Sequence, residues 1–273
     1  MSNCKIIAMC NQKGGVTKTT TTANLGIGLA MQGNKVLLVD NDPQADLTTV
    51  LGWPDSDNLP MTLTDIMEKT IKDEEFDLHG ATLHHKEGVD LVPSNIELAG
   101  MEMTLISSMS REFALKNYLD QMKKDYDYIL IDCPPSLSML TINALAVSDS
   151  VIVPVQAQYL AAKGMTQLMR TIGKVHKQIN PLLKVDGIVL TLADMRTNIA
   201  RGTLNALKHQ YGSMLKIYNT RIPIAVSAAE TSTAGKSVYI YDKGGTVAEA
   251  YTNFTKEVLK DAERAKVQSA KCR

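Results

Sequence analysis

Six strongly apolar runs recur along the chain, each about the length of one buried strand. In chain order they read KIIAMC, KVLLVD, VDLVP, YILIDCP, SVIVPVQ and VDGIVLTL. Most are separated by segments long enough for a helix, an alternation typical of a mostly parallel, twisted sheet with helices on both faces. The pattern therefore predicts an α/β protein. Because no repeat and no linker rich in Pro, Gly or Ser divides the sequence, we expect a single domain over residues 1–273.

The first apolar run leads into NQKGGVTKTTTT, residues 11–22, and then into a segment with helical spacing that ends at Gly33. A strand, a glycine turn and a helix N-terminus form a phosphate cradle, because backbone N–H groups and the helix macrodipole face the anion. Lys18 and Thr19 supply the lysine and hydroxyl that complete such a site. The common pattern GxxxxGK[ST] fails twice, where Gln12 and Thr17 replace glycine.

Polar residues follow three of the runs, at the sheet edge where this loop is expected. They are Asn11, Asp132 and the pair Asp40 and Asp42. Because ligands bind beyond the carboxyl ends of parallel strands, we expect the acids and Lys18 to converge. Mg²⁺ prefers oxygen ligands and bridges phosphate oxygens, so this group indicates a magnesium nucleotide site. Asp132 has the position of a Walker B acid; capping of the next helix is the alternative, and the upstream loop favours the metal role.

Composition narrows the class of protein. Apolar residues make up 44% and charged residues 21%, as in ordinary globular proteins, while 5% aromatics predict an aliphatic core with many methionines. No apolar run approaches the roughly 20 residues that span a bilayer. The N-terminus leads into the first strand without a signal peptide, so we expect a cytoplasmic protein. The cysteines lack the spacing of a metal or redox site, and we assign no chemistry to Cys4, Cys10, Cys133 and Cys272.

The net charge of zero hides an asymmetry along the chain. Residues 1–150 carry 11 basic and 21 acidic residues, a net charge of −10, whereas residues 151–273 carry 18 and 8, a net charge of +10. The basic part could attract a polyanion such as DNA. From charge alone we favour the simpler explanation, that these side chains keep helix faces in water.

The remaining segments are less informative. The C-terminal segment reads as a helix with Phe254, Val258 and Leu259 towards the core. Its polar end offers only Val267 to a membrane, so docking or a frayed end is favoured over a membrane-surface helix. Residues 55–60 and 69–87 read as surface insertions.

Taken together, the motifs resemble the ParA/MinD family of P-loop ATPases with a deviant Walker A motif, and within it the short ParA or Soj-like partition ATPases. The resemblance covers nearly the whole chain, through NQKGGVTKTTT, LLVDNDPQADLT, LVPSNIELAGMEM, YDYILIDCPPSLSMLTINAL, VIVPVQAQYLAAKGM and YDKGGTVAEAYTNFTKEVL. This family usually has Gln at the position of Gln12, but Gly at that of Thr17. Because a β-branched residue is poorly tolerated at positive φ, either the backbone here avoids that region or nucleotide affinity is reduced; we expect binding to be retained.

The resemblance implies ATP and Mg²⁺ as cofactors. Lys18 would hold the β- and γ-phosphates and Thr19 would bind Mg²⁺, which Asp40 and Asp132 would support through its waters. Asp42 would orient the hydrolytic water. The rest of the loop and a segment bordering adenine would complete the nucleotide site, namely Gly14, Gly15, Val16, Thr17, Thr20, Ile222 and Pro223.

The resemblance also implies a homodimer that forms on ATP binding. Lys13, the extra lysine of the family, would reach the phosphates of the nucleotide in the partner subunit, which links ATP binding to dimerisation. Arg196 matches a basic position that relatives use for DNA, whereas Ile224 and Ser227 stand where relatives often carry arginines. Other basic residues could replace them or could serve only as solvated surface, namely Arg201, Lys208, Arg221 and Lys236.

The function implied is partition of a plasmid or chromosome. The ATP-bound dimer would bind DNA without sequence preference, on the nucleoid, and a centromere-binding ParB-like protein would stimulate slow hydrolysis and release. A membrane-associated positioning ATPase similar to MinD is an alternative that the polar C-terminus disfavours. A nucleotide-sensing binding module, with hydrolysis impaired by Thr17, is another. A reductase similar to the nitrogenase iron protein is disfavoured because the cysteines offer no evident cluster ligands, and phosphotransfer to a small metabolite stays open for the fold.

Overall fold

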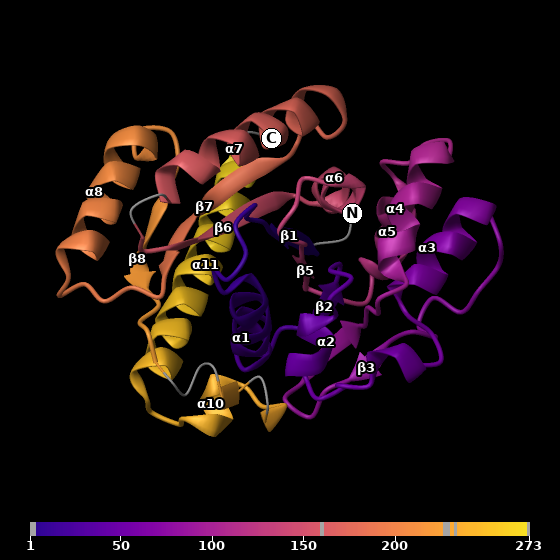
Figure 1. Ribbon diagram of the computed structural model, residues 1–273, viewed down its shortest axis with the longest axis horizontal. Helices are drawn as coiled ribbons and strands as arrows, with labels where there is room; N and C mark the ends of the chain where they lie inside the picture. Colours follow the sequence, from indigo (N-terminus) through magenta and orange to yellow (C-terminus); the bar gives the residue numbers. More distant parts are fainter. Residues whose placement is uncertain (1–3, 159–160, 226–229, 232–233, 272–273) are drawn as a thin grey trace.

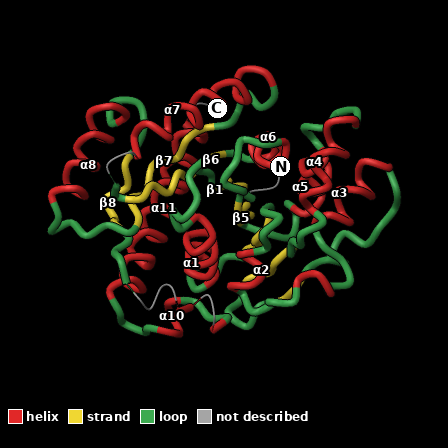
Figure 2. Tube along the Cα trace, in the orientation of Figure 1, coloured by secondary structure: helices red, strands yellow, loops and turns green. Residues whose placement is uncertain are grey.

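One sheet runs through the centre of the molecule (Figures 1 and 2). The computed structural model describes residues 4–158, 161–225, 230–231 and 234–271, and within them eight strands pair in the order β3-β4-β2-β5-β1-β6-β7-β8. β3 is antiparallel to β4, and the other neighbours are parallel. The strands are β1 (Lys5–Met9), β2 (Val36–Asp40), β3 (Leu83–His84), β4 (Val89–Val92), β5 (Tyr128–Asp132), β6 (Ser150–Gln156), β7 (Lys184–Thr191) and β8 (Ile217–Arg221).

All six apolar runs of the sequence form strands of this sheet, so the predicted α/β class is confirmed. β2 and β5 are buried at every position because helices cover both faces of the sheet. The helices are α1 (Lys18–Ala30), α2 (Asp46–Val50), α3 (Leu63–Lys72), α4 (Leu98–Ser107), α5 (Ala114–Met122), α6 (Met139–Val147), α7 (Ala161–Gln178), α8 (Asn198–Tyr211), α10 (Val238–Tyr241) and α11 (Thr246–Lys271), with a short 3₁₀ turn at Ser56–Asn58.

Alternate residues of each central strand enter different cores. On β1, Ile6 and Ala8 belong to the core that contains apolar residues of α3 to α8. Ile7 and Met9 belong to the opposite core, with α1, α2, α10 and α11. This is the period of two expected of a strand whose successive side chains point to opposite faces. Helices therefore pack against both faces of the sheet, and its carboxyl edge carries the loops described below.

The C-terminal helix α11 packs as predicted. Phe254 and Val258 are buried, Leu259 is partly buried in the same core, and the Phe254 ring meets Tyr218 of β8 edge-on at 4.9 Å between ring centroids. Val267, near the end of the helix, is 54% exposed. No helix in the described part of the chain is both long and apolar enough to cross a membrane.

Residues 55–60 lie at the surface, as predicted, but the interpretation of residues 69–87 as an insertion is wrong in part. That stretch contains the end of α3, strand β3 and the buried Ala81. The Tyr118 hydroxyl of α5 donates to its Leu78 carbonyl at 3.1 Å. Its last residue, Glu87, accepts the amide of Ser237 at 2.9 Å and thereby holds the chain before α10.

Candidate functional site

The loop between β1 and α1, residues 10–17, is fixed to the carboxyl edge of the sheet at both ends. The Asn11 side chain donates to the carbonyl of Pro154 on β6 at 2.6 Å, and its Oδ1 accepts the Lys13 amide at 3.0 Å. At the other end, the Thr191 hydroxyl on β7 donates to the carbonyl of Val16 at 3.0 Å. The loop is therefore held across the ends of β1, β6 and β7.

The turn of this loop is open to solvent on the side of Gly14 and Gly15. Both glycines are exposed, and a Cβ added to either would meet no heavy atom within 4 Å. Gly15 has a φ of +69°, in the region that favours glycine. α1 begins immediately afterwards with Lys18, and its first amides have no partner within the helix. Exposed loop backbone beside a helix N-terminus suits an anion.

Lys18 indicates most directly what this loop binds. The residue is only 7% exposed, and its ammonium makes no hydrogen bond or ion pair with any residue that the structure describes. A nearly buried charge without a partner is costly. A phosphate in the loop would provide the opposite charge, so the residues present fit a nucleotide.

Asp132 ends β5 beside the first turns of α1. Its Oδ2 accepts the Thr19 hydroxyl at 2.6 Å, and its Oδ1 accepts the Thr22 hydroxyl at 3.2 Å. Burial raises the pKa of Asp132 to about 7, while the Thr19 hydrogen bond and the charge of Lys18 oppose the rise. The two residues predicted to share the magnesium ion are thus in direct contact.

Asp40 ends β2 and is paired in register with Asp132. Its carboxylate is fully buried: Oδ2 accepts the amide and the hydroxyl of Thr48 at 2.8 and 2.7 Å, and Oδ1 accepts the amide of Asp42 at 3.3 Å. Burial, followed by the charge of Asp132, raises the pKa of Asp40 to about 8. The structure thus brings Asp40 and Asp132 together beside Lys18, as the strand pattern predicts.

The acids suit a hydrated cation better than a bare one. Among the described residues, no group of three or more His, Cys, Asp or Glu side chains is arranged to hold a metal by itself. The groups available to bind a metal are the Thr19 hydroxyl and buried carboxylates, which are hard oxygen ligands. Mg²⁺ prefers such oxygens and takes its remaining ligands from water and phosphate. The residue set therefore fits Mg²⁺ bound together with a nucleotide.

Asp42 and Lys13 lie on the rim of the site. Asp42 is 8% exposed, and its Oδ1 accepts the amide of Gln44 at 3.0 Å in the turn after β2. Lys13 is exposed, and its Nζ donates to Gln158 Oε1 at 2.7 Å, just beyond β6. The two lysines of the loop therefore differ: Lys18 turns inwards, whereas Lys13 is available at the surface.

Thr17 adopts the left-handed conformation, with φ 61° and ψ 33°. The suggestion that the backbone here avoids positive φ is therefore wrong. The Thr17 hydroxyl is buried without a hydrogen bond of normal geometry, close enough to Tyr251 of α11 to affect the pKa of that phenol. The side chain thus points into the protein and away from the open side of the loop, so the departure from glycine takes the form of backbone strain.

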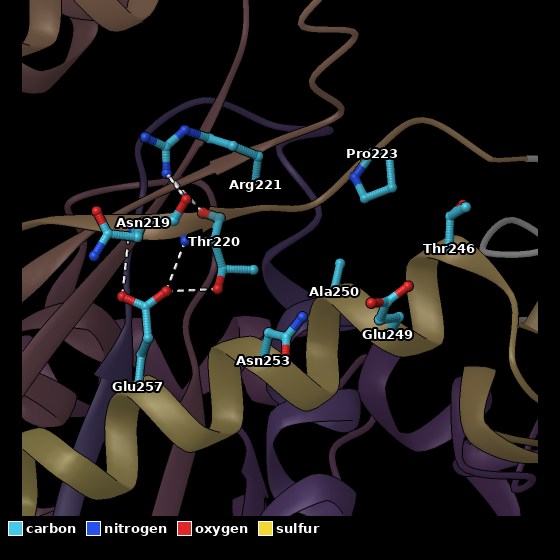
Figure 3. A pocket seen from close by; sticks show the side chains of 9 residues that line it. All are labelled: Asn219, Thr220, Arg221, Pro223, Thr246, Glu249, Ala250, Asn253 and Glu257. Carbon is cyan, nitrogen blue, oxygen red and sulfur yellow. Dashed lines mark hydrogen bonds between the residues drawn. The ribbon is translucent and has the colours of Figure 1, made fainter.

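The two residues predicted to border adenine differ in position. Ile222 is buried, its amide bonds to the Leu190 carbonyl at 2.9 Å, and its carbonyl accepts the Ala193 amide at 3.0 Å. Pro223 instead lines a hollow of about 450 Å³ between β8 and α11, whose walls also include Ala250 (Figure 3). Only Pro223 therefore offers a side chain to a ligand at this place.

The predicted DNA-binding residues are spread over separate surfaces. Arg196 is exposed, and its Nε and Nη2 donate hydrogen bonds to the two carboxylate oxygens of Asp194, each at 2.9 Å. Arg201 and Lys208 are exposed on the adjoining helix α8. Lys236 is exposed in the segment before α10, and α10 lies away from α8 (Figure 1). Arg196, Arg201 and Lys208 therefore form the part of the set that can share one DNA surface.

Arg221 is half-buried and donates to backbone carbonyls of its own strand, including that of Thr220 at 3.1 Å (Figure 3). Burial lowers the pKa of its guanidinium. Ile224 is exposed, and Ser227 lies outside the described residues. The guanidinium of Arg221 is thus partly occupied by hydrogen bonds to the backbone of β8.

Several residues at the site were given no individual role from the sequence, although they lie within the motifs and apolar runs quoted above. Thr22 and Thr48 bind the two buried acids, and Thr191 anchors the loop. The Asn41 side chain donates to the Leu140 carbonyl at 3.0 Å and so joins the turn after β2 to α6. Only the position of Asn41 between Asp40 and Asp42 could have drawn attention to it.

The sequence and the fold are similar to those of known proteins. A family model described as an AAA domain matches residues 4–185. The sporulation initiation inhibitor protein Soj of Bacillus subtilis is 44% identical, over 93% of this chain and 98% of that protein. The chromosome partitioning protein ParA of Caulobacter vibrioides is 38% identical, over 93% of this chain and 94% of that protein.

Two solved structures extend the comparison. A cobyrinic acid a,c-diamide synthase from Mycobacterium smegmatis, with bound ADP and magnesium, has a TM-score of 0.81 at 38% identity and covers 94% of each chain. A plasmid partition protein from Borrelia burgdorferi has a TM-score of 0.72 at 25% identity, over 94% of this chain and 98% of that one. On sequence and fold together, the chain belongs to the ParA/MinD family of P-loop ATPases with a deviant Walker A motif, among its Soj-like partition proteins.

Proposed function

We propose that this chain is a Mg²⁺-dependent ATPase that partitions a plasmid or a chromosome. The observation that carries the proposal is the nearly buried Lys18, whose ammonium has no hydrogen bond or ion pair among the described residues, next to the contact between Thr19 and Asp132. This is the residue set that a magnesium-bound triphosphate requires. The names of the Soj and ParA relatives supply the biological context.

In the proposed nucleotide complex, Gly14, Gly15 and the first turn of α1 surround the phosphates with backbone N–H groups. Lys18 contacts the β- and γ-phosphates. The Thr19 hydroxyl would hold Mg²⁺, while Asp40 and Asp132 act on it through water. The ion would supply positive charge to the phosphate oxygens as the γ-phosphoryl group leaves.

Asp42 is the residue proposed to orient the attacking water. It is almost buried at the rim, and the amide of Gln44 restrains one of its oxygens. Hydrolysis without a partner protein should be slow, because in-line phosphoryl transfer needs a fully positioned water and compensated charge. A ParB-like partner would supply what is missing.

Lys13 is proposed to act between subunits. Its exposed ammonium is held by the neutral side chains of Gln156 and Gln158 and, within the described ranges, by no carboxylate, so exchange for a phosphate of the partner subunit loses no ion pair. A nucleotide contacted by both subunits stabilises the dimer by its preference for that state. ATP binding and dimerisation would then be one linked event within a single domain formed by residues 1–273.

The ATP-bound dimer is proposed to bind DNA through the surface that contains α8. Arg201 and Lys208 are exposed there, and Arg196 adjoins it. Two copies of a small basic surface would give weak, sequence-independent binding that is sensitive to salt. This behaviour fits a protein that uses the nucleoid as a matrix.

One alternative has specific support. The left-handed conformation of Thr17 strains the phosphate loop, which favours a nucleotide sensor with impaired hydrolysis. The synthase among the solved structures shows that this fold also occurs in proteins named for other reactions. A membrane-positioning role has less support, since the end of α11 offers only Val267 as a bulky apolar side chain.

Titration with ATP and Mg²⁺, followed by phosphate release with and without DNA, tests the proposal. Lys18→Ala should abolish both, while Lys124→Ala, which changes an exposed lysine just before the amino end of β5, should change neither. Binding without phosphate release, even with DNA and the partner present, would favour the sensor. Unmeasurable ATP binding by the native protein would contradict the ATPase assignment.

A further inference from the structure

Thr48 binds the buried carboxylate of Asp40 more completely than any other residue does. Its amide and its hydroxyl donate to the same oxygen, Oδ2, at 2.8 and 2.7 Å. Thr48 is fully buried on the short helix α2, and its hydroxyl also accepts the amide of Ser94 beyond β4 at 3.0 Å. The hydroxyl is therefore fixed between two strands, with both its donor and its acceptor capacity in use.

The other oxygen of Asp40 faces the turn that carries the proposed water-orienting residue. Oδ1 accepts the amide of Asp42 at 3.3 Å, and Asp42 in turn accepts the amide of Gln44 at 3.0 Å. A continuous path of hydrogen bonds thus runs from Ser94 through Thr48 and Asp40 to the backbone of Asp42. Every residue on this path is buried, so water cannot easily replace a missing partner.

We propose that Thr48 is a positioning residue for ATP hydrolysis, which acts through Asp40 to fix the place of Asp42. The contacts of the Thr48 hydroxyl in the structure are with Asp40 and Ser94. Without its hydroxyl, one oxygen of Asp40 keeps only the backbone amide of Thr48, and the carboxylate can rotate beside Asp132. The amide of Asp42 then loses a fixed acceptor, and the turn that starts at Asp42 is held less firmly. This inference rests on the proposed function, because it assigns Asp42 to the attacking water.

A matched pair of substitutions separates the hydroxyl from the packing. Thr48→Val keeps the shape and removes the hydroxyl, whereas Thr48→Ser keeps the hydroxyl. We expect Thr48→Val to lower kcat about tenfold or more, because small displacements of a positioned group have large effects on rate. KM for ATP should change less than about twofold, since Lys18 and Thr19 are untouched. Thr48→Ser should stay near the native kcat.

Hydrogen exchange provides a readout that does not depend on turnover. In Thr48→Val, the amides of Asp42 and Gln44 should exchange faster than in the native protein, while those of Ile129 and Leu130 on β5 stay protected. In Thr48→Ser, all four should match the native protein. Thermal unfolding of both variants checks that they fold.

The outcomes are distinct. A native kcat and native exchange in Thr48→Val would overturn the inference. Equal losses of kcat in Thr48→Val and Thr48→Ser would also overturn it, because packing and not the hydroxyl would then matter. If the native protein binds ATP but does not turn it over, the proposed function fails, and faster exchange at Asp42 in Thr48→Val alone still supports the positioning contact.

Discussion

Asp40 and Asp132 lie opposite each other on the neighbouring parallel strands β2 and β5, each at the last residue of its strand. Both carboxyls are buried, and burial together with their mutual repulsion raises the pKa of Asp40 to about 8. Two acids so placed favour either a bound proton or a nearby cation. Ionisation of the Asp40 and Asp132 carboxyls is therefore coupled to the presence of a cation beside them.

The first prediction concerns the stability of the nucleotide-free protein. Because the pKa values of Asp40 and Asp132 are raised to about 8 and about 7, the folded state keeps protons that the unfolded state has released. Stability should therefore fall as pH rises from about 4, the ordinary pKa of an Asp carboxyl, to about 8, by about 1.4 kcal/mol for each unit of pKa difference between the states. Urea unfolding at several pH values measures it.

Asp40→Asn is the informative variant for this prediction. It removes one charge, so its free energy of unfolding should vary less with pH across the same range. Lys18→Met should extend the fall to higher pH, because Lys18 lowers the pKa of Asp132. A native protein whose unfolding free energy depends on pH no more than that of Asp40→Asn would contradict the assignment of the buried pair.

The sequence predicted the central strands well because they are buried on both faces and so are continuously apolar. It did not predict β8, which reads IYNTR, because this edge strand buries little more than Tyr218. Its outer edge is covered from α11: Glu257 accepts the amides of Asn219 and Thr220 at 3.0 and 2.7 Å (Figure 3). The carboxylate that covers this strand edge comes from a helix, 37 residues after Thr220 in the sequence. Such a distant contact leaves no local pattern in the sequence of the strand.

The second prediction concerns Thr17. Its φ of 61° is unfavourable for a β-branched residue, so Thr17→Gly should stabilise the protein by about 1 kcal/mol. The side chain points inwards, so affinity for ATP should stay the same or rise slightly. Thermal unfolding and ATP titration measure the two effects.

Ala45 provides the matched control for Thr17, because it also has a positive φ, of 54°, in the turn before α2. Ala45→Gly should relieve strain to a similar degree. ATP affinity should be unchanged in Ala45→Gly. A Thr17→Gly variant that is less stable than the native protein would show that the buried methyl and hydroxyl groups matter more than the backbone.

The third prediction concerns the contact between the loop helix and the C-terminal helix. The hydroxyls of Thr21 on α1 and Tyr251 on α11 are buried 3.2 Å apart. Tyr251→Phe and Thr21→Val should each destabilise the protein by about 1 kcal/mol, and the double variant should cost less than their sum. Urea denaturation of the four proteins gives the coupling energy. A coupling energy of zero would mean that the hydrogen bond contributes nothing.

The fourth prediction concerns DNA. If Arg201 and Lys208 each neutralise a phosphate, replacing either with Ala should reduce the slope of log affinity against log salt by about 0.9 for each duplex phosphate that is no longer neutralised. Lys124→Ala, in the acidic part of the chain, is the control. Affinity measured across a salt series with ATP present gives the slopes. Unchanged slopes in both α8 variants would place the DNA surface elsewhere.

The site was predictable in part, for a physical reason. Acids at the ends of parallel strands must meet at one edge, which made Asp40 and Asp132 foreseeable. The residues that hold them were not: Thr48 lies eight positions after Asp40 and reaches it only because α2 folds back over β2. The left-handed conformation of Thr17 was equally hidden, since the sequence indicates the missing glycine but not how the backbone accommodates it.

ATP is proposed to make this protein a dimer that binds DNA, and the other proposed roles depend on that event. Sedimentation of the native protein, Asp42→Ala and Lys13→Ala, each with and without ATP and then with DNA, follows it directly. We expect a monomer without ATP, a DNA-bound dimer with ATP that persists in Asp42→Ala, and no ATP-dependent dimer in Lys13→Ala. An oligomeric state that ATP does not change, in native protein shown to bind ATP, would contradict the proposal.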